Sequence, residues 1–225
     1  MLIFPQGLHI AGGITMPASL EEFTKFLAEN KGQRKFKQTV EVAINFKDID
    51  FSKQDNRLNL EVPLPNGKGK VKGIALFAND KSLVEGARSN NIQVIDPAEL
   101  EGVSKDAKRM QALLSFDLVA QASAMPLIAR YLGQFLGPRN RMPKPVMPNT
   151  KIETVVKELS RSVSIKSKGK YLPTVHSIVG TEDMEPSKIY ENVSEIVRAV
   201  GAKVGQNNIK SVYVKLTMSK PMKFI

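Results

Sequence analysis

Alternating apolar and polar residues predict strands near the start of the chain. From Val40 to Phe46 every second residue is apolar, which is the period of a strand with one buried face. The alternation recurs from Leu58 to Leu64 after a polar turn. We therefore expect two half-buried strands, over residues 36–46 and 58–64, that pair in one open sheet.

Helical periodicity precedes these strands and returns near the end of the chain. Ser19 and Glu22 form a capping-box pattern that predicts a helix start, and Gly32 predicts its end. Thr150 and Glu153 form a second capping-box pattern, which predicts a helix with Leu159 on its apolar face. Two strands that pair with each other are expected to follow, at 162–168 and 173–179. The last predicted elements are an amphipathic helix at 186–200 and a strand at 210–217.

The middle of the chain has a different pattern, in which short continuous apolar runs alternate with helices. The predicted strands are 73–78, 92–95 and 116–120, and the predicted helices are 81–89, 104–114 and 125–136. Continuous apolar strands separated by helices indicate a parallel sheet that is covered on both faces. The middle is therefore predicted to be an α/β, Rossmann-like domain.

The flanking segments contain strands with alternating apolar and polar residues, which the middle lacks. We therefore predict a discontinuous two-domain protein. Residues 1–66 and 150–225 form an α+β domain with a split β-α-β arrangement, and residues 67–149 form the inserted α/β domain. The turn-rich segments Pro65–Lys68 and Pro148–Lys151 are the expected paired hinges.

Composition points to a polyanionic partner. The 225 residues include 33 Lys plus Arg against 22 Asp plus Glu, a net charge of +11. Nucleic acid is the first candidate and an anionic membrane surface the second. No apolar run approaches the roughly 20 residues that cross a bilayer, and Leu2–Ile14 is too polar for a secretory signal, so a soluble protein is expected.

Cysteine and histidine usage argues against several kinds of chemistry. The chain has no cysteine and 2 histidines, so disulfides, a thiolate metal site and a protein-built zinc site are not expected. Residues 66–70, NGKGK, lack the spacing of a phosphate-binding loop. No nucleophile with a plausible base stands out. We expect no cofactor, no metal and no enzymatic activity.

A proline-rich cationic run, LGPRNRMPKP, follows the helix predicted at 125–136. Its prolines fix the backbone, so Arg139, Arg141 and Lys144 are expected to project from a stiff loop that docks on a polyanion. The run alone is equally consistent with a solvated linker.

This run also resembles the LGPRG-M-P-P signature of the L-one family of large-subunit ribosomal proteins, the proteins of the mobile ribosomal stalk. KFKQTVE at 35–41, VPLPNGKGK at 62–70 and LTMSKP at 216–221 are similar to further motifs of the family, in the same order and spacing. The resemblance, to the archaeal and eukaryotic-like type, covers the chain from about Ser19 onward. It implies the same two-domain layout, with the terminal domain as the main RNA binder.

The resemblance implies a structural constituent of the large ribosomal subunit, cytoplasmic and monomeric when free. Its implied partners are large-subunit rRNA, exit-site tRNA, whose deacylated form it helps to release, and its own mRNA, whose translation it represses. The alternative function is an RNA-modifying or nucleotide-dependent enzyme that acts through the inserted domain.

Candidate RNA contacts combine residue chemistry with the resemblance. Phe36 can stack on a base, Lys35 can meet a phosphate and Thr39 can reach a sugar hydroxyl, although strict alternation places Phe36 on the buried face. Ser219 and Asn140 stand where the family has glycine. A side chain at Ser219 either obstructs close approach or donates a hydroxyl. The predicted RNA-binding residues are Lys35, Phe36, Lys37, Thr39, Glu41, Lys166, Lys168, His176, Ser211, Thr217, Met218 and Ser219.

Overall fold

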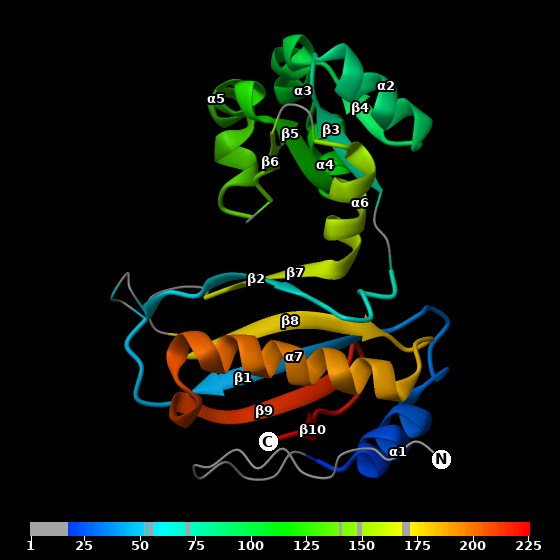
Figure 1. The fold of residues 1–225 in the computed structure, drawn as a ribbon, viewed down its shortest axis with the longest axis vertical. Coiled ribbons are helices and arrows are strands. Elements are labelled where there is room, and N and C mark those ends of the chain that lie inside the picture. The colour runs from blue at the N-terminus through cyan, green and yellow to red at the C-terminus, as the bar shows by residue number, and fades with distance from the viewer. Residues whose placement is uncertain are drawn as a thin grey trace. The chain divides into compact units, whose positions relative to one another are not determined.

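The chain forms two compact units in a computed structural model that describes residues 18–51, 53, 56–70, 73–139, 141–147, 150–167 and 172–225. Met1–Gly69 and Arg161–Ile225 make up the terminal unit, and Lys70–Ser160 make up the middle unit (Figure 1). Within the described ranges, no helix is long and apolar enough to cross a membrane.

The terminal unit is built on a four-stranded antiparallel sheet, sheet A, in the order β10-β9-β1-β8. Helix α7 connects β8 to β9, which lie on opposite sides of β1, so the predicted split β-α-β arrangement is confirmed. The elements are α1 (Leu20–Asn30), β1 (Thr39–Phe46), β8 (Thr174–Thr181), α7 (Pro186–Val204), β9 (Ile209–Leu216) and β10 (Met222–Lys223).

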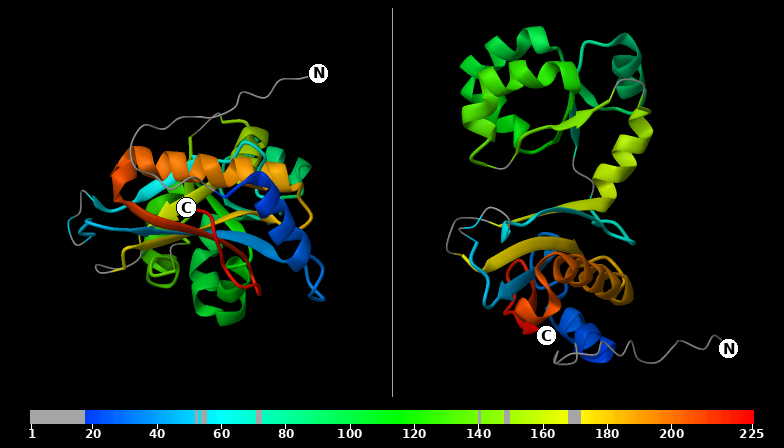
Figure 2. Two further views of the ribbon diagram at one scale, coloured as in Figure 1. Left: turned by 90° about the horizontal axis from the view of Figure 1, so that it is seen from below. Right: turned by 60° about the vertical axis from the view of Figure 1, so that its left-hand side comes forward.

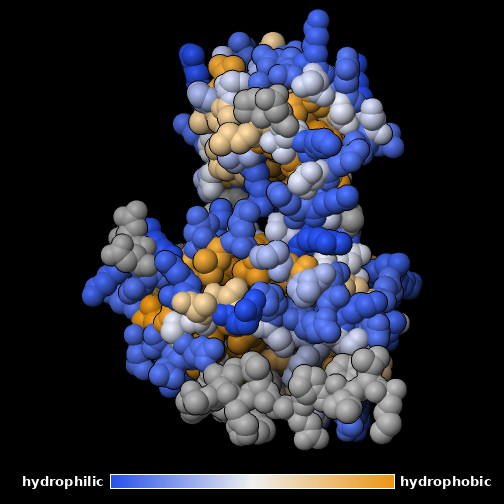
Figure 3. Space-filling view, in the orientation of Figure 1, coloured by the Kyte–Doolittle hydropathy of each residue, from blue (hydrophilic) through white to orange (hydrophobic). Residues whose placement is uncertain are grey.

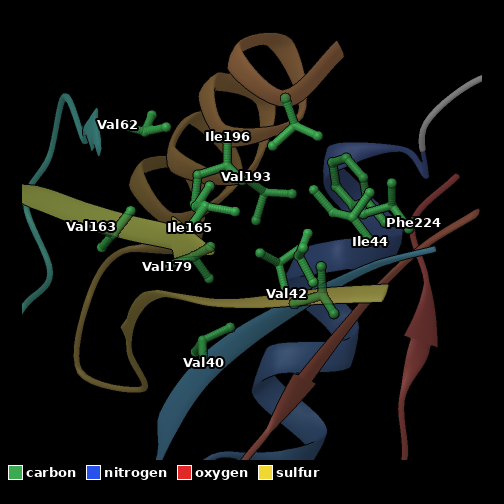
Figure 4. Close-up of a cluster of buried hydrophobic side chains, with 14 of the residues drawn as sticks. Val40, Val42, Ile44, Val62, Val163, Ile165, Val179, Val193, Ile196 and Phe224 are labelled. Carbon is green, nitrogen blue, oxygen red and sulfur yellow. The ribbon is translucent and has the colours of Figure 1, made fainter. Parts of the chain in front are cut away.

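One core holds this unit together. Alternate residues of β1 are buried, as the sequence predicts, and they pack against the apolar stripe of α7. Figure 4 shows Val42 and Ile44 of β1 gathered with Val193 and Ile196 of α7. Helix α1 adds Phe23 and Leu27 to the same cluster, and the predicted capping box between Ser19 and Glu22 is present.

The strand predicted at 58–64 does not join β1. Instead, β2 (Asn59–Pro63) pairs with β7 (Ser162–Lys166) in a separate two-stranded sheet, sheet B. The predicted pairings of 58–64 with 36–46 and of 162–168 with 173–179 were therefore wrong. Both edges of β1 are taken by β8 and β9, and sheet B buries its apolar side in the core that sheet A also covers. Alternation fixes the buried face of a strand but not its partner.

The middle unit contains sheet C, a parallel sheet in the order β4-β3-β5-β6. Separate apolar clusters lie against alternate residues of β3 and β5, as expected for a sheet covered on both faces. The expected helix at 104–114 is instead two helices, α3 and α4, because Asp106 caps the second through the N–H groups of Lys108 and Arg109. The strands are β3 (Ile74–Phe77), β4 (Gln93–Ile95), β5 (Asp117–Gln121) and β6 (Lys144–Val146), and the helices are α2 (Lys81–Ser89), α3 (Leu100–Lys105), α4 (Ala107–Leu113), α5 (Met125–Leu136) and α6 (Ile152–Arg161).

The limits of the two units differ from the predicted limits at residues 66/67 and 149/150. Helix α6 buries Ile152, Val155 and Leu159 against β3 and β5, so it packs as part of the middle unit. The segment Pro65–Lys68, a predicted hinge, belongs to the terminal unit, where the Asn66 N–H donates to Asn192 Oδ1 at 3.2 Å. Pro148 and Asn149 of the other predicted hinge lie outside the described residues.

Candidate nucleic-acid interface

The residues of sheet A that alternate with the core residues form a second, half-exposed face. Cross-strand pairing places Glu41 between Ile178 and Lys215, and Ala43 between His176 and Tyr213. Figure 2 shows α7 lying along one side of the strands only. We call the opposite side the polar face; it consists of Thr39, Glu41, Ala43, Asn45, Thr174, His176, Ile178, Ser211, Tyr213 and Lys215.

Two segments that are far apart in the sequence meet at one end of this face. The Thr217 hydroxyl accepts a hydrogen bond from the Thr39 N–H at 3.1 Å and lies 3.3 Å from the Thr39 carbonyl oxygen. The Thr217 N–H donates to the same oxygen at 3.1 Å. The structure thus brings together the predicted contacts of residues 35–41 and 217–219. We call residues 35–39 and 217–219 the binding end.

Large apolar side chains are exposed at the binding end. Phe36 is 48% exposed and Met218 is 60% exposed. The alternative that places Phe36 in the core was wrong, because β1 begins only at Thr39 and its alternation does not extend back to residue 36. In the view of Figure 3, apolar patches interrupt a largely hydrophilic surface. An exposed ring on a polar, cationic surface suits stacking with an unpaired base.

Ser211 lies at the other end of the polar face and is only 8% exposed. Its hydroxyl accepts from Asn45 Nδ2 at 3.0 Å, while Thr174 donates to Asn45 Oδ1 at 2.9 Å. The three side chains link three neighbouring strands. Asn45 and Thr174 were absent from the predicted site, although Asn45 occupies an alternating polar position of β1.

Ser219 uses its hydroxyl to hold the turn that follows β9. Its Oγ accepts from the Leu216 N–H at 2.9 Å and donates to the Lys220 carbonyl at 2.9 Å. Among the described non-glycine residues, only Asp48 and Asn91 have positive φ, so Ser219 takes this position without left-handed strain. Serine therefore replaces the family glycine without straining the backbone. Asn140 lies outside the described residues.

The predicted cations are in different environments. Lys35 is exposed at the binding end, whereas Lys37 Nζ lies 2.6 Å from Asp183 Oδ2. Their hydrogen bond, the largest cause, raises the pKa of Lys37 and lowers that of Asp183, so both groups are charged at neutral pH. His176 is exposed on the polar face, while Lys166 belongs to sheet B and pairs with Asn59. Lys168 lies outside the described residues.

The proline-rich run of the middle unit is not the projecting loop that was predicted. The Arg139 guanidinium stacks over the Phe135 ring at 4.1 Å and donates to the Phe135 carbonyl at 2.8 Å. Arg141 lies 3.7 Å from an Asp117 carboxylate oxygen. Lys144 begins β6, an edge strand of sheet C, where a proline is tolerated because one side of the strand needs no partner. These contacts hold the run against its own unit.

Across the described ranges, no group of three or more histidine or acidic residues is arranged to hold a metal ion. The binding end instead presents hydroxyl groups, exposed apolar side chains and lysines. Such a surface can stack bases, meet phosphates and bond to ribose hydroxyls.

Comparison with known proteins shows the family of the chain. The model of the ribosomal protein L1p/L10e family matches residues 27–220. The chain is 43% identical over 195 residues to the large ribosomal subunit protein uL1 of Thermococcus kodakarensis, covering 84% of this chain and 89% of that protein. It is 41% identical over 216 residues to the uL1 protein of Pyrococcus abyssi, covering 92% and 97%. The chain therefore belongs to the ribosomal protein L1p/L10e family.

Proposed function

We propose that this chain is a structural constituent of the large ribosomal subunit and that it binds large-subunit rRNA through the binding end and the polar face. The observation that carries the proposal is the junction of Thr39 with Thr217, flanked by exposed Phe36 and Met218. The relatives, which are large-subunit proteins by name, support the ribosomal assignment.

The proposed interface binds RNA in two ways: charged side chains meet phosphates, and an aromatic ring stacks on a base. Lys35 and Lys37 are the proposed phosphate contacts, which predicts an affinity that falls as salt rises. Phe36 provides a stacking surface for an unpaired base, and hydroxyl groups along the sheet can distinguish ribose by its 2′-hydroxyl. Glu41 lies opposite Lys215 on the neighbouring strand, and we propose that its carboxylate accepts from a base amino group rather than facing phosphate.

Further partners follow from the family resemblance and belong to the same proposal. The middle unit contacts exit-site tRNA and assists the release of its deacylated form. A similar RNA fold in the protein's own mRNA competes for the binding end, which represses translation. Arg139 and Arg141, held in fixed positions by contacts within the middle unit, are the residues proposed for the tRNA contact.

The test is a binding titration of the full chain with a fragment of large-subunit rRNA and with a scrambled RNA of the same length, over a range of salt concentrations. We expect tighter binding to the rRNA fragment at every salt concentration, and about 1 to 3 kcal/mol of lost affinity for Phe36→Ala. Leu172→Ala, which removes an apolar side chain that is 60% exposed and lies outside the proposed interface, is the matched control. Equal affinity for the two RNAs contradicts the proposal.

A further inference from the structure

Gln38 is the buried polar residue of the binding end. It is 2% exposed and lies just before β1, where it continues the alternate burial of Val40 and Val42. A polar side chain in that position was not among the predicted site residues. Every buried side-chain nitrogen and oxygen of the described residues has a hydrogen-bond partner, and a buried amide such as this one imposes strict requirements on the geometry of its partners.

The Gln38 amide joins three parts of the terminal unit. Its Oε1 accepts from the Met218 N–H at 3.1 Å, and its Nε2 donates to the Asn30 carbonyl at the end of α1 at 3.1 Å. The same nitrogen lies 3.4 Å from Glu182 Oε2, in the turn after β8. The Glu182 N–H in turn donates to the Gln38 carbonyl at 3.0 Å.

This arrangement fixes the orientation of one peptide unit in the proposed RNA contact. Thr217 and Ser219 have their own bonds to Thr39 and Leu216, so the turn persists when Gln38 is replaced. The Met218 N–H, however, has its hydrogen bond to Gln38. Losing that acceptor frees the peptide between the two fixed residues to rotate, and with it the exposed Met218 side chain.

We infer that Gln38 is a positioning residue for RNA binding: it touches no RNA and pre-organises the Met218 peptide and the turn around it. The inference rests on the proposed function, because it assigns a role to Gln38 in that same site. Pre-organisation raises affinity because the ordering is complete before the ligand arrives. Gln38 also lies between Lys37 and Thr39, so the same anchor fixes the start of β1 beside the turn.

Two variants separate this role from general stability. Gln38→Met keeps the length of the side chain but removes its donor and acceptor. The paired variant Gln38→Glu with Glu182→Gln retains an acceptor for the Met218 N–H and reverses the polarity of the contact with residue 182, but it also removes the donor to the Asn30 carbonyl. The matched control is Asn192→Leu, which removes another buried amide, one that donates to the Val179 and Gly67 carbonyls.

Two measurements are made on the full chain: the Kd for the rRNA fragment at fixed salt, and hydrogen exchange at the Met218 amide without RNA. For Gln38→Met we expect a Kd about tenfold weaker and faster exchange at Met218. The paired variant is expected to restore the slow exchange at Met218 and part of the affinity, because the bond to the Asn30 carbonyl stays broken. Asn192→Leu is expected to lower the free energy of unfolding while keeping the Kd within about twofold.

If hydrogen exchange at Met218 is unchanged in Gln38→Met, Gln38 does not hold the Met218 N–H. If the Kd is unchanged, Gln38 has no role in RNA binding. Equal loss of affinity in Asn192→Leu also overturns the inference, because the effect is then one of general stability. If the unmodified protein shows no preference for the rRNA fragment, the proposed function fails and the role in RNA binding fails with it. The exchange measurement still reports on the anchor in that case.

Discussion

At the binding end, single hydroxyl and amide groups form hydrogen bonds with backbone atoms of the neighbouring segment. Thr217 bonds to the Thr39 backbone and Ser219 to the Leu216 N–H. A hydroxyl has two acceptor sites and one proton, so Thr217 retains capacity for a further partner while it holds Thr39. The residues proposed to contact RNA therefore also stabilise the local structure. For each substitution, both the free energy of unfolding and the affinity for RNA must be measured.

Thr217→Val is expected to weaken binding of the rRNA fragment by about 1 to 3 kcal/mol, because it removes a hydroxyl that bonds to Thr39 and is proposed to reach RNA. The measurement is the Kd at fixed salt, together with the urea midpoint. Thr217→Ser keeps the hydroxyl and is the control, with a Kd near that of the unmodified protein. A normal Kd for Thr217→Val removes Thr217 from the contact.

Asp183→Asn is expected to tighten RNA binding by up to about fivefold at low salt, because the carboxylate that holds Lys37 also repels phosphate. The gain is expected to shrink as salt rises. Glu195→Gln removes one negative charge from α7, where Glu195 pairs with Arg198, and controls for net charge. Equal gains in both variants show that only total charge matters.

The ion pair has a defined pH range. The hydrogen bond from Lys37 lowers the pKa of Asp183 below its unfolded value, so the pair's small contribution to stability is present above about pH 4 and is lost as the pH falls through the folded pKa. Binding measurements near neutral pH therefore compare fully charged groups.

At the level of whole elements, two glycines, Gly133 and Gly69, have opposite effects on stability. In α5, a Cβ added at Gly133 meets no atom within 4 Å, so this glycine only weakens the helix. At Gly69, φ is +71° and a Cβ would lie 2.5 Å from Met184 Sδ and 2.6 Å from Thr181 Oγ1. Glycine takes this positive φ without strain, and a side chain at residue 69 would require Met184 or Thr181 to shift.

Gly133→Ala is expected to raise the free energy of unfolding by about 0.5 to 1 kcal/mol, since alanine has the higher helix propensity. Gly69→Ala is expected to lower it, because of the positive φ and the close neighbours. Urea unfolding of both variants provides the comparison. A loss of stability in Gly133→Ala would falsify the assignment of open space at that position.

The terminal unit is continuous in space although the chain leaves it and returns. Strands β2 and β7 pair directly, with Pro63 opposite Ser162, and the Leu64 N–H donates to the Arg161 carbonyl at 2.8 Å. Sheet B thus holds Leu64, shortly before the chain leaves the unit after Gly69, next to Arg161, where the chain re-enters it. The middle unit has its own clusters of buried residues on either side of sheet C.

A variant in which a short glycine-serine linker joins Gly69 to Arg161, replacing the middle unit, is expected to fold and to keep the Kd for the rRNA fragment within about threefold. Circular dichroism and urea unfolding test its fold, and the binding titration tests its function. A folded variant that no longer binds the fragment shows that the middle unit contributes directly to rRNA recognition.

Local pattern determined much of this protein by itself. Alternation predicted β1 and β9, the apolar stripe predicted α7, and the continuous apolar runs predicted a parallel sheet between them. Four short motifs were enough to suggest the family that the comparisons show. These features depend on the spacing of residues within one segment, which the sequence contains in full.

Tertiary structure decided what depends on contacts between segments. It paired β2 with β7, assigned α6 to the middle unit and turned part of the proline-rich run into the edge strand β6. It exposed Phe36 and buried Gln38, although both continue the every-second-residue spacing of the buried residues of β1. Periodicity states which side of a strand is apolar, but burial and partner choice depend on what other elements cover that side and on where the strand begins.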